Sequence, residues 1–150
     1  LNRRSKLNYK SDLLLIMASR SENMDKILKK NYGKKIILID RFIDSTIAYQ
    51  HYGMGINLDL INILNKFILG NFIPSFTFLN IVNKKNMRSR LSKRFNLNRY
   101  DKFNLSFYSR VQNGFLNLSK NKRNYLIIDS NKNSIKENSQ IIINKIKKLI

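Results

Sequence analysis

Three short apolar runs most constrain how this chain of 150 residues can fold. Residues 35–40 and residues 125–129 each end in an aspartate, and residues 75–81 follow the only proline, Pro74. Runs of this length that are rich in β-branched residues are typical of strands buried on both faces of a parallel sheet. The sequence therefore predicts three such strands.

Helical patterns separate these runs. Residues 11–30, 57–69 and 101–119 each carry apolar side chains at helical spacing, and Ser134 with Glu137 forms a capping box that opens a last helix running to residue 150. The second of these helices has Asn57 to cap its start and Gly70 to cap its end. Its predicted buried face consists of Leu60, Ile61, Leu64, Phe67 and Ile68.

This alternation predicts an α/β domain in three layers, with a parallel sheet flanked by helices. Ligands of such sheets bind beyond the carboxyl ends of the strands. Asp40 and Arg41 follow directly on the first predicted strand, so we expect them at a ligand site.

Composition excludes some classes of site and leaves the partner open. The chain has no cysteine and one histidine, which excludes disulfides, thiolate metal sites and histidine clusters. Its 29 basic and 9 acidic residues give a net charge of +20, which attracts polyanions but also fits a genome rich in Lys, Asn and Ile codons. No stretch is suited to a membrane span or a secretory signal, so a soluble cytoplasmic protein is expected. The chain begins with Leu1, which indicates a fragment or a processed product.

The segment from Asp40 to Gln50 is the first of three polar clusters. After the carboxylate of Asp40 and the guanidinium of Arg41, it carries hydrogen-bonding groups within one or two helical turns: Ser45, Thr46, Tyr49 and Gln50. Ser45, Tyr49 and Gln50 can share part of one helix face, where they could read a flat polar ligand. The alternative is structural, with a hydroxyl that caps a helix and a tyrosine at the edge of the core.

The other two clusters are basic. Arg20 ends an apolar helix run, and residues 88–99 hold a dense group of cations between a strand and a helix. Arginine forks bind phosphate oxygens in a bidentate way, so a basic segment over a transferring phosphoryl group would supply positioning and charge. The alternatives are a solvated arginine and a solvated basic loop.

In their order and spacing these clusters resemble the thymidylate kinase family. The family pattern Asp-Arg-(Phe/Tyr)-x-x-Ser-(Ser/Thr)-x-Ala-Tyr-Gln matches residues 40–50 at every fixed position, and a Leu-Leu-Phe-x-Ala-x-Arg helix corresponds to residues 14–20. The family's lid pattern corresponds to Arg90, Arg94, Arg99 and Asp101. The resemblance covers nearly the whole chain. It implies a P-loop kinase fold and transfer of the γ-phosphate of ATP to dTMP, giving dTDP for dTTP synthesis.

The resemblance also implies a role for each matched residue. Arg20, Ser45 or Thr46, and Gln50 would contact the base, and Tyr49 would lie near the sugar and help to exclude ribonucleotides. Arg41 would contact the dTMP phosphate and hold the reacting groups, while the lid residues Arg90, Arg94 and Arg99 would close over ATP. Ile16 stands where the family has a phenylalanine that stacks on thymine, and Phe42 is a candidate substitute.

Asp40 would be an outer-shell partner of Mg²⁺, the cofactor that accompanies ATP. The family further implies a homodimer, with neither nucleic acid nor a membrane as partner.

The largest departure from the family is the absence of a Gly-x-x-x-x-Gly-Lys-(Ser/Thr) sequence anywhere in the chain. We therefore expect residues 1–150 to form a single partial kinase domain with a lid at about residues 84–100. The first strand or strands and the P-loop would lie upstream of Leu1, and the fragment itself would be inactive. A deoxynucleoside kinase and a basic nucleic-acid-binding module remain as alternative functions.

Overall fold

The computed structural model describes residues 7–93, Tyr100 and residues 103–150. The chain divides into two compact units. The first consists of Leu1–Ile73 and Ser106–Leu118, and the second of Pro74–Leu105 and Ser119–Ile150. The arrangement as one kinase domain stays a prediction.

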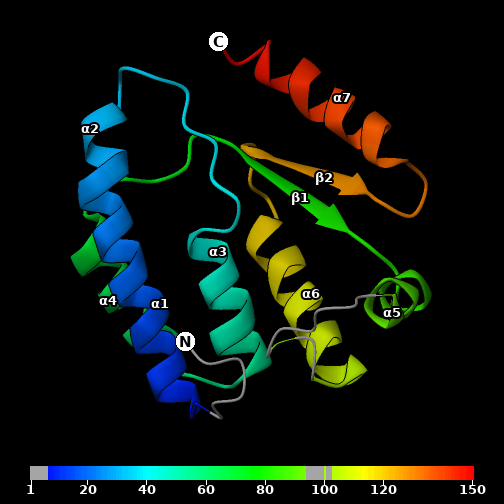
Figure 1. The fold of residues 1–150 in the computed structure, drawn as a ribbon, viewed down its shortest axis with the longest axis horizontal. Helices are drawn as coiled ribbons and strands as arrows, with labels where there is room; N and C mark the ends of the chain where they lie inside the picture. The colour runs from blue at the N-terminus through cyan, green and yellow to red at the C-terminus, as the bar shows by residue number, and fades with distance from the viewer. Residues whose placement is uncertain (1–6, 94–99, 101–102) are drawn as a thin grey trace. The chain divides into compact units, whose positions relative to one another are not determined.

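The first unit opens with the helix predicted over residues 11–30. It consists of α1 (Tyr9–Asn23), a π-helical stretch η1 (Met24–Leu28) and the short α2 (Lys29–Asn31). The Asn8 side chain caps α1 by accepting a hydrogen bond from the backbone N–H of Ser11 at 2.8 Å. Helix α1 packs beside α4 (Leu58–Leu69), as Figure 1 shows.

Helix α4 has the predicted ends, and its buried face agrees with the predicted one only in part. Asn57 caps its start, and Gly70 takes a positive φ of 55° at its end. Its buried residues are Ile61, Asn65 and Leu69, whereas Phe67 is 86% exposed. Leu64 and Ile68 pack onto the core clusters as predicted. The prediction was wrong for Phe67 and for Leu60, which is 47% exposed, because the buried stripe follows an i, i+4, i+8 spacing that begins at Ile61.

Two apolar clusters form the core of the first unit. The first contains Leu13, Met17, Ile47 and Ile61, so it joins α1 to α4. The second contains Met24 and Leu28 of η1 and Leu69 of α4, so it joins η1 to the end of α4. These clusters hold the helices that carry most of the predicted site residues.

The strand predicted over residues 35–40 is absent from the structure. This segment forms neither a helix nor a strand and has no hydrogen-bonded partner strand among the described residues. Ile36, Leu38 and Ile39 are 61%, 75% and 45% exposed, and only Ile37 packs onto the second core cluster. The prediction was wrong because a strand needs a neighbour to complete its backbone hydrogen bonds, and an apolar run cannot supply one.

The sheet of the second unit consists of β1 (Thr77–Ile81) and β2 (Tyr125–Asp129). The strands are parallel, with Thr77 opposite Tyr125 and Ile81 opposite Asp129. Both strands were predicted, and β2 has the predicted ends. Leu79 and Ile128 are the buried members of the pair.

Helices α5 (Lys84–Ser92) and α7 (Ile135–Ile146) belong to the same unit as the sheet. The predicted capping box at Ser134 and Glu137 is present, and α7 ends before residue 150. Lys145 of α7 lies over the ring of Phe76 at 5.0 Å. Helix α6 (Leu105–Ser119) starts later than the predicted residue 101, and most of it belongs to the first unit.

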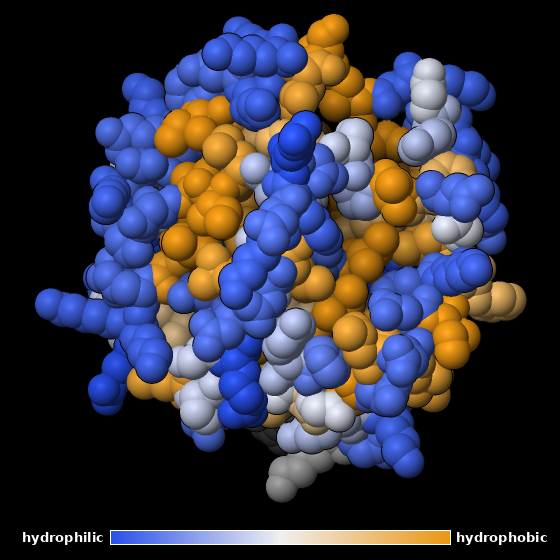
Figure 2. All heavy atoms as spheres, turned by 180° about the vertical axis from the view of Figure 1, so that it is seen from behind, coloured by the Kyte–Doolittle hydropathy of each residue, from blue (hydrophilic) through white to orange (hydrophobic). Residues whose placement is uncertain are grey.

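The predicted class, α/β with a parallel sheet flanked by helices, is confirmed. No helix in the described part of the chain is long and apolar enough to cross a membrane. Apolar residues nevertheless reach the surface between polar ones, as the face in Figure 2 shows.

Candidate functional site

Arg20 lies at the centre of a polar cluster inside the first unit. Its Nη1 donates to Asn65 Oδ1 at 3.0 Å and to Met17 Sδ at 3.8 Å. Its Nη2 donates to the Phe42 carbonyl oxygen at 3.1 Å and to Thr46 Oγ1 at 2.6 Å. Partial burial lowers the pKa of this guanidinium from its ordinary value, and the hydrogen bonds compensate the partly buried charge.

This geometry limits what Arg20 can offer a ligand. A guanidinium has five N–H donors, and protein atoms engage the four terminal ones. The contact with the thioether of Met17 is the weakest, because sulfur is a poor acceptor. A base could replace that contact at little cost, and the contact of Arg20 with the base stays a prediction.

The segment after Arg41 turns into a helix of mixed register, α3 (Ile43–Thr46) followed by the π-helical η2 (Ile47–Gly53). Stretches of π-helix are rare and occur frequently at functional sites. Thr46 and Gln50 are buried, whereas Ser45 and Tyr49 are half-buried. The predicted polar residues therefore divide between the interior and the surface of this helix.

Gln50 is 1% exposed, and its Nε2 donates to Asp12 Oδ2 at 3.1 Å. Its Oε1 has no hydrogen-bond partner in the described part of the chain. A buried acceptor without a partner is costly in a folded protein and indicates a missing ligand or water.

Arg41 has a strained backbone and an aromatic neighbour. Its φ of 65° lies in the left-handed region, which is uncommon for a residue with a side chain. Strain of this kind clusters at active sites and ligand clamps. The Arg41 guanidinium lies over the Tyr49 ring at 5.1 Å, and Tyr49 in turn makes edge contacts with Phe107 and Phe115.

Phe42 is already used as a partner of an arginine. The Arg20 guanidinium lies over its ring at 5.4 Å, and the ring packs against the second core cluster. Ile16, the residue in the position of the family's stacking phenylalanine, is half-buried on α1. That Phe42 takes the place of the family's stacking phenylalanine stays a prediction.

The predicted lid, residues 84–100, begins with the helix α5. The alternative of a solvated basic loop is therefore wrong for this part of the segment. Arg90 belongs to the second unit and donates from Nη2 to the Ser130 carbonyl oxygen at 2.9 Å. Arg94 and Arg99 lie outside the described residues.

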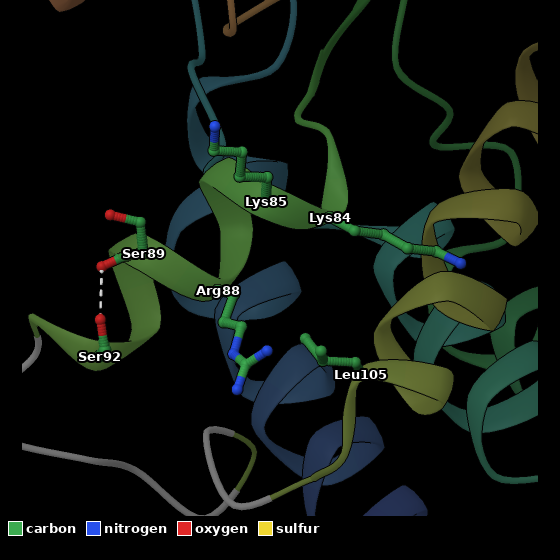
Figure 3. A pocket seen from close by; sticks show the side chains of 6 residues that line it. All are labelled: Lys84, Lys85, Arg88, Ser89, Ser92 and Leu105. Carbon is green, nitrogen blue, oxygen red and sulfur yellow. Dashed lines mark hydrogen bonds between the residues drawn. The ribbon is translucent and has the colours of Figure 1, made fainter.

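A different face of α5 lines a cavity of about 520 Å³. Its lining residues are Lys84, Lys85, Arg88, Ser89, Ser92 and Leu105. In Figure 3 the charged ends of Lys84, Lys85 and Arg88 point in different directions, and only Arg88 extends towards Leu105. This cavity is therefore a basic surface without a converged binding geometry.

Asp40 is exposed next to Arg41. No group of three or more potential metal-ligating side chains is found among the described residues. Mg²⁺ in nucleotide enzymes keeps several waters and is held by one or two carboxylates together with substrate phosphates. A single accessible carboxylate fits that outer role and could not hold the ion alone.

Two residues of the polar cluster were missed by the sequence analysis. Asn65 had a signal, because it interrupts the buried stripe of Ile61 and Leu69 with an amide. Asp12 had a weaker one, since it is an acidic residue directly before an apolar helix run. Its pairing with Gln50 spans 38 positions, a distance over which no local pattern carries information.

Comparison with known proteins decides the family. A sequence model described as thymidylate kinase matches residues 1–142. The chain belongs to the thymidylate kinase family. The family prediction and the predicted P-loop kinase fold are thereby confirmed, and the alternative families are not favoured.

Individual thymidylate kinases are similar to this chain in sequence and in structure. The chain is 41% identical over 148 residues to thymidylate kinase of Ehrlichia ruminantium (strain Gardel), covering 94% of this chain and 69% of that protein. It is 36% identical over 140 residues to that of Wolbachia sp. subsp. Brugia malayi (strain TRS), covering 91% of this chain and 66% of the relative. The crystal structure of thymidylate kinase from Ehrlichia chaffeensis matches with a TM-score of 0.71 at 33% identity, covering 98% of this chain and 70% of that one. The chain thus spans about two thirds of the length of these relatives.

Proposed function

We propose that this chain carries the dTMP-binding part of a thymidylate kinase, which transfers the γ-phosphate of ATP to dTMP. The observation that carries the proposal is the segment from Asp40 to Gln50. It combines a left-handed arginine with a buried, partly unpartnered amide in a chain of the thymidylate kinase family. A deoxynucleoside kinase and a nucleic-acid-binding module have no observation of their own in their favour.

The base would bind to the polar cluster of the first unit. Gln50 offers an acceptor that has no partner among the described residues. Arg20 donates to Thr46 at 2.6 Å, which fixes both side chains before a ligand binds. Ser45 would add a hydroxyl at the half-buried edge, and Tyr49 would lie beside the sugar. Ile16 and Phe42 would form the apolar walls.

The phosphate of dTMP would bind to Arg41. Its guanidinium is exposed at the start of α3, and the aromatic group beneath it limits the directions in which it can swing. Phosphoryl transfer asks for positioning and for cations around the transferring oxygens more than for covalent chemistry. We propose that Arg90 and Arg94 of the lid supply these cations, and that Arg99 contributes to the lid over ATP.

Asp40 would hold Mg²⁺ through water, with the remaining ligands supplied by nucleotide phosphates. When bound, the ion would neutralise charge on the transferring group. These 150 residues contain no P-loop sequence, so we expect them to bind dTMP without useful turnover.

A second copy of the chain is the proposed partner protein. Leu60, Ile63 and Phe67 of α4 are 47%, 65% and 86% exposed and lie at i, i+3, i+7, so they form one apolar stripe. A homodimer is also what the family resemblance implies. We place the protein in the cytoplasm and expect no role for nucleic acid or a membrane in its function.

Calorimetric titration of the 150-residue chain tests the proposed function. It should bind dTMP, bind thymidine about tenfold or more weakly for lack of the phosphate, and show no ADP formation with ATP. Arg41→Ala should bring the affinity for dTMP close to that for thymidine, whereas Arg88→Ala on α5 should not. Tight, salt-sensitive DNA binding without nucleotide binding would sink the proposal, and robust turnover would refute the expected inactivity.

In the complete enzyme the same residues should separate binding from turnover. Arg41→Ala should strongly reduce turnover, whereas Gln50→Ala should mainly raise the KM for dTMP. Wild-type kinetics in both variants would show that the assigned site is wrong.

A further inference from the structure

The side-chain amide of Gln50 has a fixed direction. Its neighbour Asp12 is 3% exposed and presents a carboxylate, which can only accept hydrogen bonds when ionised. The nitrogen of the amide must therefore face Asp12, as the 3.1 Å contact from Nε2 to Oδ2 has it. Turning the amide by 180° would place its oxygen against the carboxylate, which is repulsive.

The opposite end of this amide is consequently an acceptor. Oε1 of Gln50 is buried and has no hydrogen-bond partner among the described residues. A glutamine free to rotate could present either a donor or an acceptor to a ligand. In this protein Asp12 of α1 fixes the orientation of the amide before any ligand binds.

We infer that Asp12 is a positioning residue that makes Gln50 an obligate hydrogen-bond acceptor and thereby selects bases that carry a ring N–H. This inference rests on the proposed function, because it takes the base to be the ligand of Gln50. Thymine and uracil carry a proton on N3 and satisfy Oε1. Cytosine has an unprotonated N3, so its lone pair would face the oxygen of Gln50 and leave both acceptors buried without a donor.

The side-chain amide of Asn65 is oriented in the same way, but here the group that is left over is a donor. Arg20 donates to its Oδ1 at 3.0 Å, so its Nδ2 is turned away from the guanidinium. This nitrogen is also buried without a partner in the described part of the chain. A charged neighbour therefore orients each of these two buried amides. In the described part of the chain this leaves an acceptor on Gln50 and a donor on Asn65 for a ligand.

The test keeps the size and shape of residue 12 and changes its charge and its hydrogen-bonding character. Asp12→Asn keeps the size of the side chain but can donate to Gln50 Oε1, which allows the Gln50 amide to turn and present Nε2. The ratio of the affinities for dTMP and dCMP, measured by calorimetry on the full chain, should fall about tenfold or more. Asp59→Asn, an identical change at an exposed position in the first turn of α4, should leave the ratio unchanged.

The outcomes separate this role from a merely structural one. A loss of affinity for both nucleotides by the same factor, or a wild-type ratio in Asp12→Asn, would overturn the inference. If Asp12→Asn does not fold, N3-methylated dTMP provides the test with the unaltered chain. The methyl group removes the N3 proton, so binding should weaken about tenfold or more, and unchanged binding would refute the acceptor role.

The failure of the proposed function would be recognisable separately. If the unaltered chain binds neither dTMP nor dCMP, the proposed function fails. The orientation of the amide is then read from the side-chain NMR signals of Gln50 in the free protein. Protected Nε2 protons that lose protection in Asp12→Asn would support the positioning by Asp12, and fast exchange in the unaltered chain would refute it.

Discussion

At the scale of single residues, the interior of the first unit contains polar side chains that form hydrogen bonds with one another. Arg20, Thr46 and Asn65 form one hydrogen-bonded set, and Asp12 with Gln50 forms another. Buried polar groups are tolerated when they are paired, and each unpaired atom lowers the stability of the fold. Gln50 Oε1 and Asn65 Nδ2 have no partner among the described residues, so they lower the stability of the fold, and a ligand that pairs with them would restore it.

The hydrogen bond between Arg20 and Thr46 should contribute measurably to stability. Thr46→Val keeps the shape of a side chain that is 2% exposed but removes the acceptor 2.6 Å from the guanidinium. We expect the free energy of unfolding in urea to fall by about 1–3 kcal/mol, because the substitution leaves a partly buried guanidinium without one of its acceptors. Thr77→Val in β1 is the matched control and should have a small effect, since valine suits a strand.

The left-handed backbone of Arg41 predicts a difference between two truncations. Arg41→Ala keeps the strain of a φ of 65°, whereas Arg41→Gly relieves it. The glycine variant should be more stable to urea by about 1 kcal/mol, while both variants lose the preference for dTMP over thymidine. Equal stability of the two would mean that the left-handed conformation is not maintained in solution.

At the scale of elements, the side chains of the segment 35–39 divide between the core and the solvent. Ile37 packs onto the second core cluster, whereas Leu38 is 75% exposed. Ile37→Lys should lower the free energy of unfolding by about 2 kcal/mol, because a charged group replaces a packed side chain. Leu38→Lys should change it by less than about 0.5 kcal/mol. A large loss in the second variant would show that this segment has an apolar partner in solution.

Helices with local signals could be predicted from the sequence. The caps at Asn57 and Ser134 fix helix starts through contacts within three residues, and these predictions were confirmed. The run 125–129 was also predicted correctly as a strand, because it finds a parallel partner in β1. The run 35–40 has the same pattern but no partner strand in the described part of the chain, so the pattern alone could not distinguish the two runs.

The candidate site was predictable in its residues and not in its contacts. The motif identified Thr46 and Gln50, but their partners Arg20 and Asp12 lie 26 and 38 positions away. Pairings over such distances depend on how the helices pack. The exposed Phe67 has the same cause, since the rotation of α4 about its axis is decided by its neighbours.

At the scale of the whole molecule, charge is divided unevenly. Sixteen of the 29 basic residues but three of the nine acidic residues fall in the second unit, so its formal net charge is +13 of the total +20. No acidic residue occurs between Asp59 and Asp101. Self-repulsion on this scale opposes the compact state.

Salt should therefore stabilise the protein. We expect the melting temperature to rise as sodium chloride increases from about 0.05 M to about 0.5 M, because the screening length becomes shorter than the spacing of the surface charges. A variant with Lys84→Glu and Arg88→Glu should show a weaker dependence. A melting temperature that falls with salt would mean that ion pairs, and not repulsion, dominate.

The pairing of β1 with β2 also bears on how the chain acquires its structure during synthesis. Thr77 meets Tyr125, so the whole segment from Val82 to Asn124 has to be made before the first pair of the sheet can form. Helices such as α1 and α4 close over a few residues and can form as soon as they leave the ribosome. The apolar residues of β1 must meanwhile wait without a neighbour, and this interval is when the growing chain is most exposed to aggregation and most in need of a chaperone.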